Sequence, residues 1–225
     1  MVAGCAAVTA SLGLAFAGQA RPDGLDAAVD AHVRSGLGQY GEQLRLLAEV
    51  GGQVPVAVLT AALILACLAT RRWRGAALAG LAVPGAMVLT EYVLKPLVGR
   101  TILSGYNCYP SGHTTAMFAF AATCAVLLAG PARPRLPGAV RVLLILGAAL
   151  VSAGVAASMV GRGYHYFTDT VGGTAVGIGV VLLTALVIDR AAAAPLARSP
   201  LRRAGDLPVA TAPDVSIESP GPVGR

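Results

Sequence analysis

The sequence is poor in charged side chains. Only 12% of its 225 residues are Asp, Glu, Lys or Arg, whereas a soluble domain carries about 25%. Hydrophobic residues make up 56% of the chain, and the mean hydropathy is +0.70. So few charges cannot cover a water-facing surface, and the composition therefore excludes a soluble globular protein. The chain also lacks the periodic repeats of a collagen-like or coiled-coil protein.

Cysteine and lysine are scarce as well. The four cysteines lack the spacing of metal ligands, and three of them, Cys5, Cys67 and Cys124, lie in apolar runs. We therefore expect neither a disulfide framework nor a bound metal, and no cofactor is predicted. Lys95 is the only lysine among 17 basic residues, which draws attention to its surroundings.

Long apolar segments are the main feature that is present. A helix of about 20 apolar residues crosses a hydrocarbon core of roughly 30 Å. The sequence therefore predicts an all-α integral membrane bundle of six transmembrane helices, or five if the first segment is a cleaved signal ending at Ala15-Phe16-Ala17. Glycines in the last segment, at positions 172, 173, 177 and 179, favour close helix packing. The six segments are 2–17, 54–70, 76–98, 114–130, 142–160 and 170–188.

The basic residues indicate the orientation of these segments. If all six segments span, eleven basic residues fall on one side and six on the other, and the richer side is expected to be cytoplasmic. Both chain ends then lie in the cytoplasm. The basic clusters are explained as topology signals, so no nucleic acid partner is predicted. The eleven are Arg71, Arg72, Arg74, Arg133, Arg135, Arg141, Arg190, Arg198, Arg202, Arg203 and Arg225.

Two polar regions lie outside the predicted spans. Residues 191–225 are rich in Ala, Pro and Arg, which is typical of a disordered tail and limits the membrane domain to residues 1–190. Residues 23–53 follow the first segment and predict a helix that lies along the outer membrane surface. The apolar positions at helical spacing in this helix are Leu25, Val29, Val33 and Leu37.

Polar and ionisable residues gather in three segments that the predicted topology places on the outer side. They are 91–100 at the end of the third span, 109–113 at the start of the fourth, and 161–169 before the sixth. Ionisable groups at membrane depth cost a few kcal/mol each, so they are functional candidates.

These segments carry the side chains of a phosphate site. Lys95, Arg100 and Arg162 supply three positive charges, which suit a phosphate monoester of charge about −1.5 to −2. Ser111 and Gly112 lie where a loop enters a helix, and the backbone N–H groups of a helix N-terminus bind anions.

Two histidines accompany these cations. His165 and Asp169 are four residues apart and share a face if the segment is helical. A carboxylate bonded to one ring nitrogen makes the other nitrogen a better nucleophile or base. The second histidine, His113, has no such partner. The residues alone therefore predict a phosphate site with an activated histidine.

At these residues the sequence resembles the type 2 phosphatidic acid phosphatase superfamily. The family pattern has three parts, K-x6-R-P, P-S-G-H and S-R-x5-H-x3-D. The second part is complete at residues 110–113, and the third matches at Ser158, His165 and Asp169. The resemblance implies that His165 attacks phosphorus and forms a phosphohistidine, that His113 protonates the leaving oxygen, and that the cations bind the phosphate.

The sequence departs from this pattern at both arginines. Ile102 and Leu103 stand where the first part has Arg-Pro, and Met159 follows Ser158 where the third part has Arg. We hypothesise that Arg100 and Arg162, which lie nearby in the chain, replace the missing arginines.

The resemblance implies an integral membrane phosphatase of lipid phosphates or diphosphates, acting at the extracytoplasmic face, with membrane lipids as its surroundings. A polyprenyl diphosphate such as undecaprenyl diphosphate is the first candidate substrate, and phosphatidic acid or phosphatidylglycerol phosphate the second. Two other classes stay open. One is a metal hydrolase that uses His113, His165 and Asp169 as ligands. The other is a non-catalytic protein that binds or transports lipid phosphates. The sequence does not indicate the oligomeric state.

Overall fold

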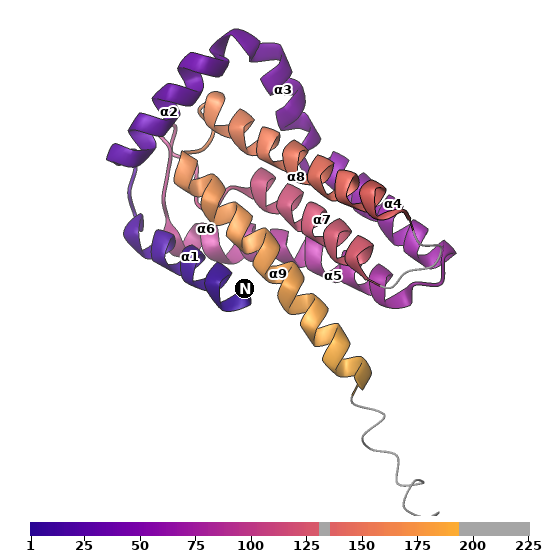
Figure 1. Cartoon of the computed structure of the whole chain (residues 1–225). Helices are drawn as coiled ribbons and strands as arrows, with labels where there is room; N and C mark the ends of the chain where they lie inside the picture. Colours follow the sequence, from indigo (N-terminus) through magenta and orange to yellow (C-terminus); the bar gives the residue numbers. More distant parts are fainter. Residues whose placement is uncertain (131–135, 194–225) are drawn as a thin grey trace, which may run out of the picture. The chain divides into compact units, whose positions relative to one another are not determined.

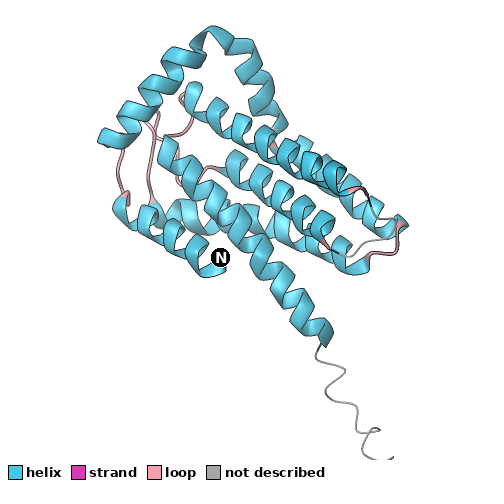
Figure 2. Cartoon of the chain, viewed as in Figure 1, coloured by secondary structure: helices cyan, strands magenta, loops and turns pink. Residues whose placement is uncertain are grey.

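The computed structural model describes residues 1–130 and 136–193, and all the longer regular elements within these residues are helices (Figure 2). The predicted class, an all-α membrane bundle, is confirmed. A π-helical segment, Leu89–Leu94, joins α5 to α6. The helices are α1 (Val2–Ala15), α2 (Gly24–Leu37), α3 (Gly41–Val50), α4 (Gln53–Ala69), α5 (Trp73–Val88), α6 (Lys95–Val98), α7 (Gly112–Ala129), α8 (Gly138–Gly161) and α9 (Phe167–Ala193).

The number of spans differs from the six predicted. Within the described residues, four stretches are long and apolar enough to cross a membrane: Trp73–Val98, α7, α8 and α9. A fifth exists if Gly24–Val50 and α4, which meet at a bend of 49°, count as one broken span. Helix α1 has 14 residues and is therefore about 21 Å long, shorter than the roughly 30 Å core. Six full spans are thus not confirmed.

The polar region after α1 is helical, but it forms two helices, α2 and α3, where the sequence predicted one. Val29 and Val33 are half-buried, but Leu25 at the start of the pattern is 56% exposed. The residues of α2 that are fully buried are Asp26 and Asp30. The predicted apolar face is therefore wrong at its beginning, because these two acids find polar partners inside the protein.

The centre of the bundle is built from small side chains. Helix α7 packs against α8, α5 and α4, and Figure 1 shows it between α8 and α5. Such residues let helix backbones approach closely where no hydrophobic effect drives helices together in lipid. The fully buried alanines of α5 and α7 are Ala79, Ala82, Ala86, Ala116 and Ala119.

Two glycines set the contact between α9 and α7. A Cβ added to Gly173 would lie 2.6 Å from the carbonyl oxygen of Ser111, and one added to Gly177 would lie 2.6 Å from that of Thr115. Both separations are far below van der Waals contact, so only glycine permits this approach. The predicted close packing at these positions is confirmed, and it holds the N-terminal ends of α7 and α9 together.

Part of the sequence prediction lies outside the described residues. Helix α9 continues to Ala193, past the predicted domain boundary at residue 190. Residues 194–225, which form most of the predicted tail, and 131–135, which include Arg133 and Arg135, are not described. The tail therefore stays a prediction.

Candidate active site

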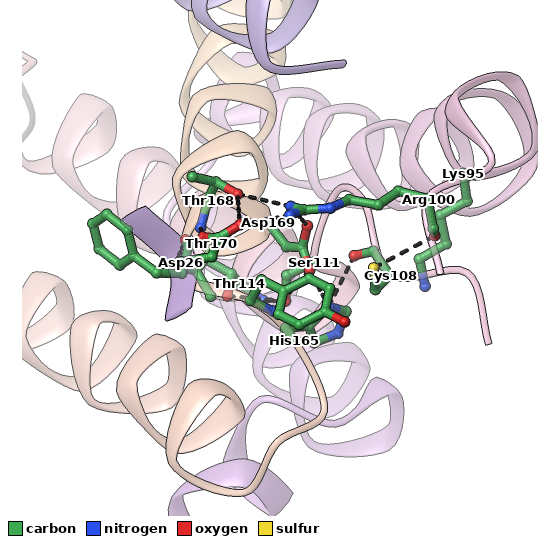
Figure 3. Close-up of polar contacts among 12 residues, drawn as sticks. Asp26, Lys95, Arg100, Cys108, Ser111, Thr114, His165, Thr168, Asp169 and Thr170 are labelled. Carbon is green, nitrogen blue, oxygen red and sulfur yellow. Dashed lines mark hydrogen bonds and ion pairs between the residues drawn. The ribbon is translucent and has the colours of Figure 1, made fainter. Parts of the chain in front are cut away.

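The three polar segments meet at one end of the bundle. The backbone N–H of Ser111, before α7, donates to the carbonyl oxygen of Asp169 in the first turn of α9 at 3.0 Å. The imidazole of His165 bonds to the carbonyl oxygen of Cys108 at 2.8 Å. Figure 3 shows His165, Ser111 and Cys108 close together in this region. Residues far apart in the sequence therefore converge, as the topology predicted.

The hydrogen bond at Nδ1 of His165 determines which ring nitrogen carries the hydrogen. A carbonyl oxygen can only accept, so Nδ1 carries the hydrogen and donates it to Cys108. In the neutral ring the lone pair is then on Nε2. The sequence suggested Asp169 for this orienting role, but its Oδ2 lies 3.7 Å from Nδ1, within ion-pair range and too far for a hydrogen bond. Asp169 thus acts on His165 through its charge.

The Asp169 carboxylate is committed to other donors. Its Oδ1 accepts from Nη1 of Arg100 at 2.6 Å, and its Oδ2 accepts from the backbone N–H of Tyr166 at 2.8 Å. The side chain is fully buried. Asp169 is therefore held rigidly, and its negative charge stays fixed beside the His165 ring.

Arg100 does not reach outward to a phosphate, as the sequence hypothesis proposed. Its side chain is fully buried, and Nη2 lies 2.5 Å from Oδ2 of Asp26 while Nη1 binds Asp169 and Thr168. Figure 3 shows the guanidinium of Arg100 directed at Asp169 and Thr168. Protein oxygens thus occupy both terminal nitrogens. The geometry assigns Arg100 to positioning Asp169.

The charge on Arg100 is maintained by its neighbours. Burial alone would lower the pKa of the guanidinium, but the Asp169 and Asp26 carboxylates outweigh it and raise the pKa above its ordinary value. The planar group also lies 4.0 Å from the ring centre of Phe16 and 4.6 Å from that of Tyr166. These contacts are of the cation–π kind, and they fill the faces of the guanidinium that carboxylates cannot reach.

Asp26 is the residue of this cluster that the sequence analysis missed. Besides Arg100, it accepts from the backbone N–H and the hydroxyl of Thr168, both at 2.8 Å. Its helix, α2, was expected to lie on the membrane surface. One signal could have pointed to it, since Asp26 and Asp30 are four residues apart and share a helix face. The partner 74 residues away had no such local signal.

Arg162 does not join the hydrogen-bonded group of Asp169, Arg100 and Asp26. Helix α8 ends at Gly161, and Gly163 has a left-handed backbone with φ of +74°, so the chain turns between Arg162 and His165 and the two residues do not share a helix. The guanidinium of Arg162 donates to the Tyr164 hydroxyl at 3.0 Å. Arg162 also lines a polar cavity, together with Asp30 and Arg34.

Lys95 pairs with a carboxylate of its own helical segment and lies beside Gly112. Its Nζ lies 2.7 Å from Oε2 of Glu91, one turn earlier, and the lysine side chain is 17% exposed. A Cβ added to Gly112 would collide with the Glu91 carboxylate and lie 3.7 Å from Lys95 Nζ. Glycine at this position therefore brings Lys95 next to the N-terminus of α7. The π-helical segment that carries Glu91 is of a kind often found at functional sites.

Ser111 and His113 complete the group at the N-terminus of α7. Ser111 is the N-cap, and its buried hydroxyl oxygen accepts from the Thr114 hydroxyl at 3.1 Å and from the Thr114 N–H at 3.5 Å. Neither of these bonds uses the hydrogen of the Ser111 hydroxyl. His113 is half-buried and lies within electrostatic reach of His165, Lys95 and Glu91. The two imidazoles and the lysine are thus near enough to influence one another electrostatically.

The fold is that of a multi-pass membrane protein. The sequence profile of the PAP2 superfamily matches residues 2–192, so the chain belongs to the PAP2 superfamily. This match confirms the resemblance seen in the sequence and the predicted enzyme class, a phosphoric ester hydrolase.

A solved structure has a similar fold. It is described as the first transmembrane PAP2 type phosphatidylglycerolphosphate phosphatase from Bacillus subtilis. The TM-score is 0.67 at 17% sequence identity, over 84% of this chain and 96% of that one. At this identity the likeness concerns the fold. No curated protein matches the sequence at a significant level.

Proposed function

We propose that this protein removes phosphate from lipid phosphates or diphosphates through a phosphohistidine formed on His165. The observation that carries the proposal is the hydrogen bond from His165 Nδ1 to the Cys108 carbonyl oxygen, 2.8 Å long. It directs the lone pair of the neutral ring to Nε2, where it can attack phosphorus.

The reaction takes two steps. In the first, Nε2 forms a bond to phosphorus while the phosphorus–oxygen bond to the leaving group breaks, and His113 gives its proton to the leaving oxygen. The Asp169 carboxylate, 3.7 Å from Nδ1, stabilises the positive charge that develops on the ring. In the second step water attacks phosphorus, His113 accepts a proton from that water, and the phosphorus–nitrogen bond breaks to release phosphate.

The charge of the phosphate is balanced by groups at the start of α7. Lys95 lies beside Gly112 in the first turn of this helix. The backbone N–H groups of a helix N-terminus favour an anion, so the lysine and the helix can bind the same phosphate. The Ser111 hydroxyl adds one donor. Since phosphoryl transfer depends mainly on positioning and charge stabilisation, these residues supply the main requirements of the reaction.

An apolar groove of about 610 Å³ suits the hydrocarbon chain of the substrate. It runs between α1, α6 and α9 and is lined by Leu94, next to Lys95, and by Tyr109, two residues before Ser111. A lipid whose phosphate is bound at His165 can therefore place its chain in apolar surroundings. This supports a lipid phosphate over a water-soluble ester.

Two lipids are candidate substrates. The first is a polyprenyl diphosphate, which suits a site at the extracytoplasmic face, the orientation that the arginine distribution predicts if six segments span. A glycerol-containing lipid phosphate, such as phosphatidylglycerol phosphate, is the second candidate. It is favoured by the polar cavity that Asp30, Arg34 and Arg162 line.

Phosphate release from a panel of lipid phosphates tests the proposal. We expect the purified protein to be active in EDTA and inhibited by orthovanadate, which mimics a trigonal-bipyramidal phosphorus. His165→Ala and His113→Ala should abolish release, whereas His32→Ala, an exposed histidine of α2, should not. Loss of activity in EDTA would favour the metal hydrolase. Lipid binding without phosphate release by the wild type would favour a non-catalytic protein.

A further inference from the structure

A second cavity, of about 600 Å³, lies beside the candidate active site. Its polar walls come from Asp30 and Arg34 of α2, Ser104 of the loop after α6, and Arg162 and Tyr166 between α8 and α9. Tyr166 directly follows His165 in the sequence, and its backbone N–H donates to Asp169. One wall of this cavity is therefore a neighbour of the proposed nucleophile.

Buried polar atoms without a partner gather at this cavity. Within the part of the chain that the structure describes, five buried side-chain atoms make no hydrogen bond. Three of them belong to residues that line the cavity: Oδ2 of Asp30, Nε of Arg162 and Oη of Tyr166. Asp30 is 2% exposed and Tyr166 5%. Because buried polar groups in proteins are nearly always hydrogen-bonded, this concentration points to a ligand.

The chemistry of the walls restricts what that ligand can be. A carboxylate oxygen accepts, an arginine Nε–H donates, and a phenol does both. Asp30 disfavours an anion, and Arg34 and Arg162 disfavour a cation. The nearest charged contact of the Asp30 Oδ2 is Nη2 of Arg34, at 3.6 Å. A hydroxyl group satisfies the whole set, because it can donate to Asp30 and accept from Arg162 and Tyr166.

We propose that this cavity binds a neutral, hydroxyl-rich group and that the group is the polar headgroup of the substrate lipid. This rests on the proposed phosphatase function and deepens it. The substrate class is a lipid phosphate that carries free hydroxyls, as the glycerol of phosphatidylglycerol phosphate does. Phosphatidic acid and polyprenyl diphosphates have no such hydroxyls beside their phosphate, so the cavity gives them no binding energy.

Substrate competition in the intact protein tests the cavity. We expect kcat/KM for phosphatidylglycerol phosphate to exceed that for phosphatidic acid by about tenfold or more, since hydrogen bonds to charged groups discriminate at this level. Asp30→Asn and Tyr166→Phe should lower this ratio toward one. Tyr106→Phe, at a tyrosine that is 75% exposed and outside the cavity, should leave the ratio unchanged.

The possible outcomes distinguish a failure of the proposed headgroup site from a failure of the proposed phosphatase function. Equal kcat/KM values for the two lipids in the wild type, or an unchanged ratio in both variants, would mean that the cavity holds water only and would overturn the inference while leaving the phosphatase intact. If no lipid is hydrolysed, the proposed function fails, and equilibrium binding of the same two lipids in nanodiscs still decides the inference. Inhibition by free glycerol that persists in Tyr166→Phe would also overturn it. Inhibition by free glycerol that is lost in this variant, without lipid discrimination, would assign the cavity to a soluble polyol and contradict the headgroup.

Discussion

Asp26 and Arg100 form a fully buried ion pair, with Oδ2 of the carboxylate 2.5 Å from Nη2 of the guanidinium. The other terminal nitrogen of Arg100 binds Asp169 at 2.6 Å. Two carboxylates from helices distant in sequence thus share one cation, and the second carboxylate stands beside the proposed nucleophile. Because a buried pair rarely adds net stability over apolar packing, we interpret this arrangement as positioning.

Asp26→Asn tests that interpretation. The amide keeps the shape and the acceptor for Thr168 but removes a charge, so Arg100 and Asp169 can shift and kcat should fall by up to about 100-fold with little change in KM. Asp23→Asn, which preserves the N-cap of the same helix, is the control. A purely structural Asp26 would lower the amount of folded enzyme and leave kcat per folded molecule unchanged.

Arg100→Ala should be strongly destabilising. It leaves the fully buried carboxylates of Asp26 and Asp169 without their cation, and breaking a buried pair in this way costs about 3–5 kcal/mol. Arg45→Ala removes an exposed arginine paired with Glu42 and Glu49 and should cost far less, because exposed ion pairs add little stability. Thermal unfolding in detergent compares the two. Similar midpoints for both variants would contradict the buried role of Arg100.

Asp30 predicts a pH-dependent stability. Burial raises the pKa of its carboxyl to about 6, the nearby Asp26 and Asp169 carboxylates add to the rise, and the Phe167 N–H and Arg34 oppose it. The folded protein then binds this proton more tightly than the unfolded chain, so this contribution to stability is lost as the pH rises through 6. Because the unfolded carboxyl has a pKa of 3.8, Asp30→Asn should unfold near the wild-type temperature below about pH 4 and increasingly above it as the pH rises to 8. A difference that is constant over this range would show that Asp30 is not titrating.

Gly173→Ala tests the contact that aligns α7 and α9. The added Cβ would lie 2.6 Å from the Ser111 carbonyl oxygen, which is backbone and cannot swing away. Stability and activity should both decrease. Gly147→Ala in α8, where a Cβ would meet nothing within 4 Å, should gain about 0.5–1 kcal/mol from helix propensity. Equal behaviour of the two variants, measured by unfolding and phosphate release, would contradict the close approach.

The sequence predicts the helices and the segments of the site well, because both depend on local signals. Apolar length identifies α7, α8 and α9, and the P-S-G-H tetrapeptide identifies the N-terminus of α7. The sequence does not predict where the side chains of Arg100 and Arg162 lie. Spacing along the chain does not predict that Arg100 binds Asp26, which lies on another helix. Nor does it predict that the chain turns at the left-handed Gly163 and that Arg162 lines a separate cavity.

The role of Cys108 could not be predicted for a similar reason. Its contribution is a backbone carbonyl, which every residue has, so no side chain marks it. Burial raises the pKa of its thiol well above the ordinary value, so the side chain stays neutral beside Asp169.

The length of α1 was predicted wrongly for another reason. Small apolar residues at 2–17 satisfy a hydropathy test, although the helix ends at Ala15.

Trapping the covalent intermediate tests the central claim most directly. Short incubation with a lipid labelled in its terminal phosphate, followed by denaturation in base, should leave label on the wild-type protein, bound to His165 through a bond that acid cleaves. The same incubation should give no labelled protein with His165→Ala. Substrate turnover by the wild type with no label on the protein, or label that survives in His165→Ala, would contradict the account.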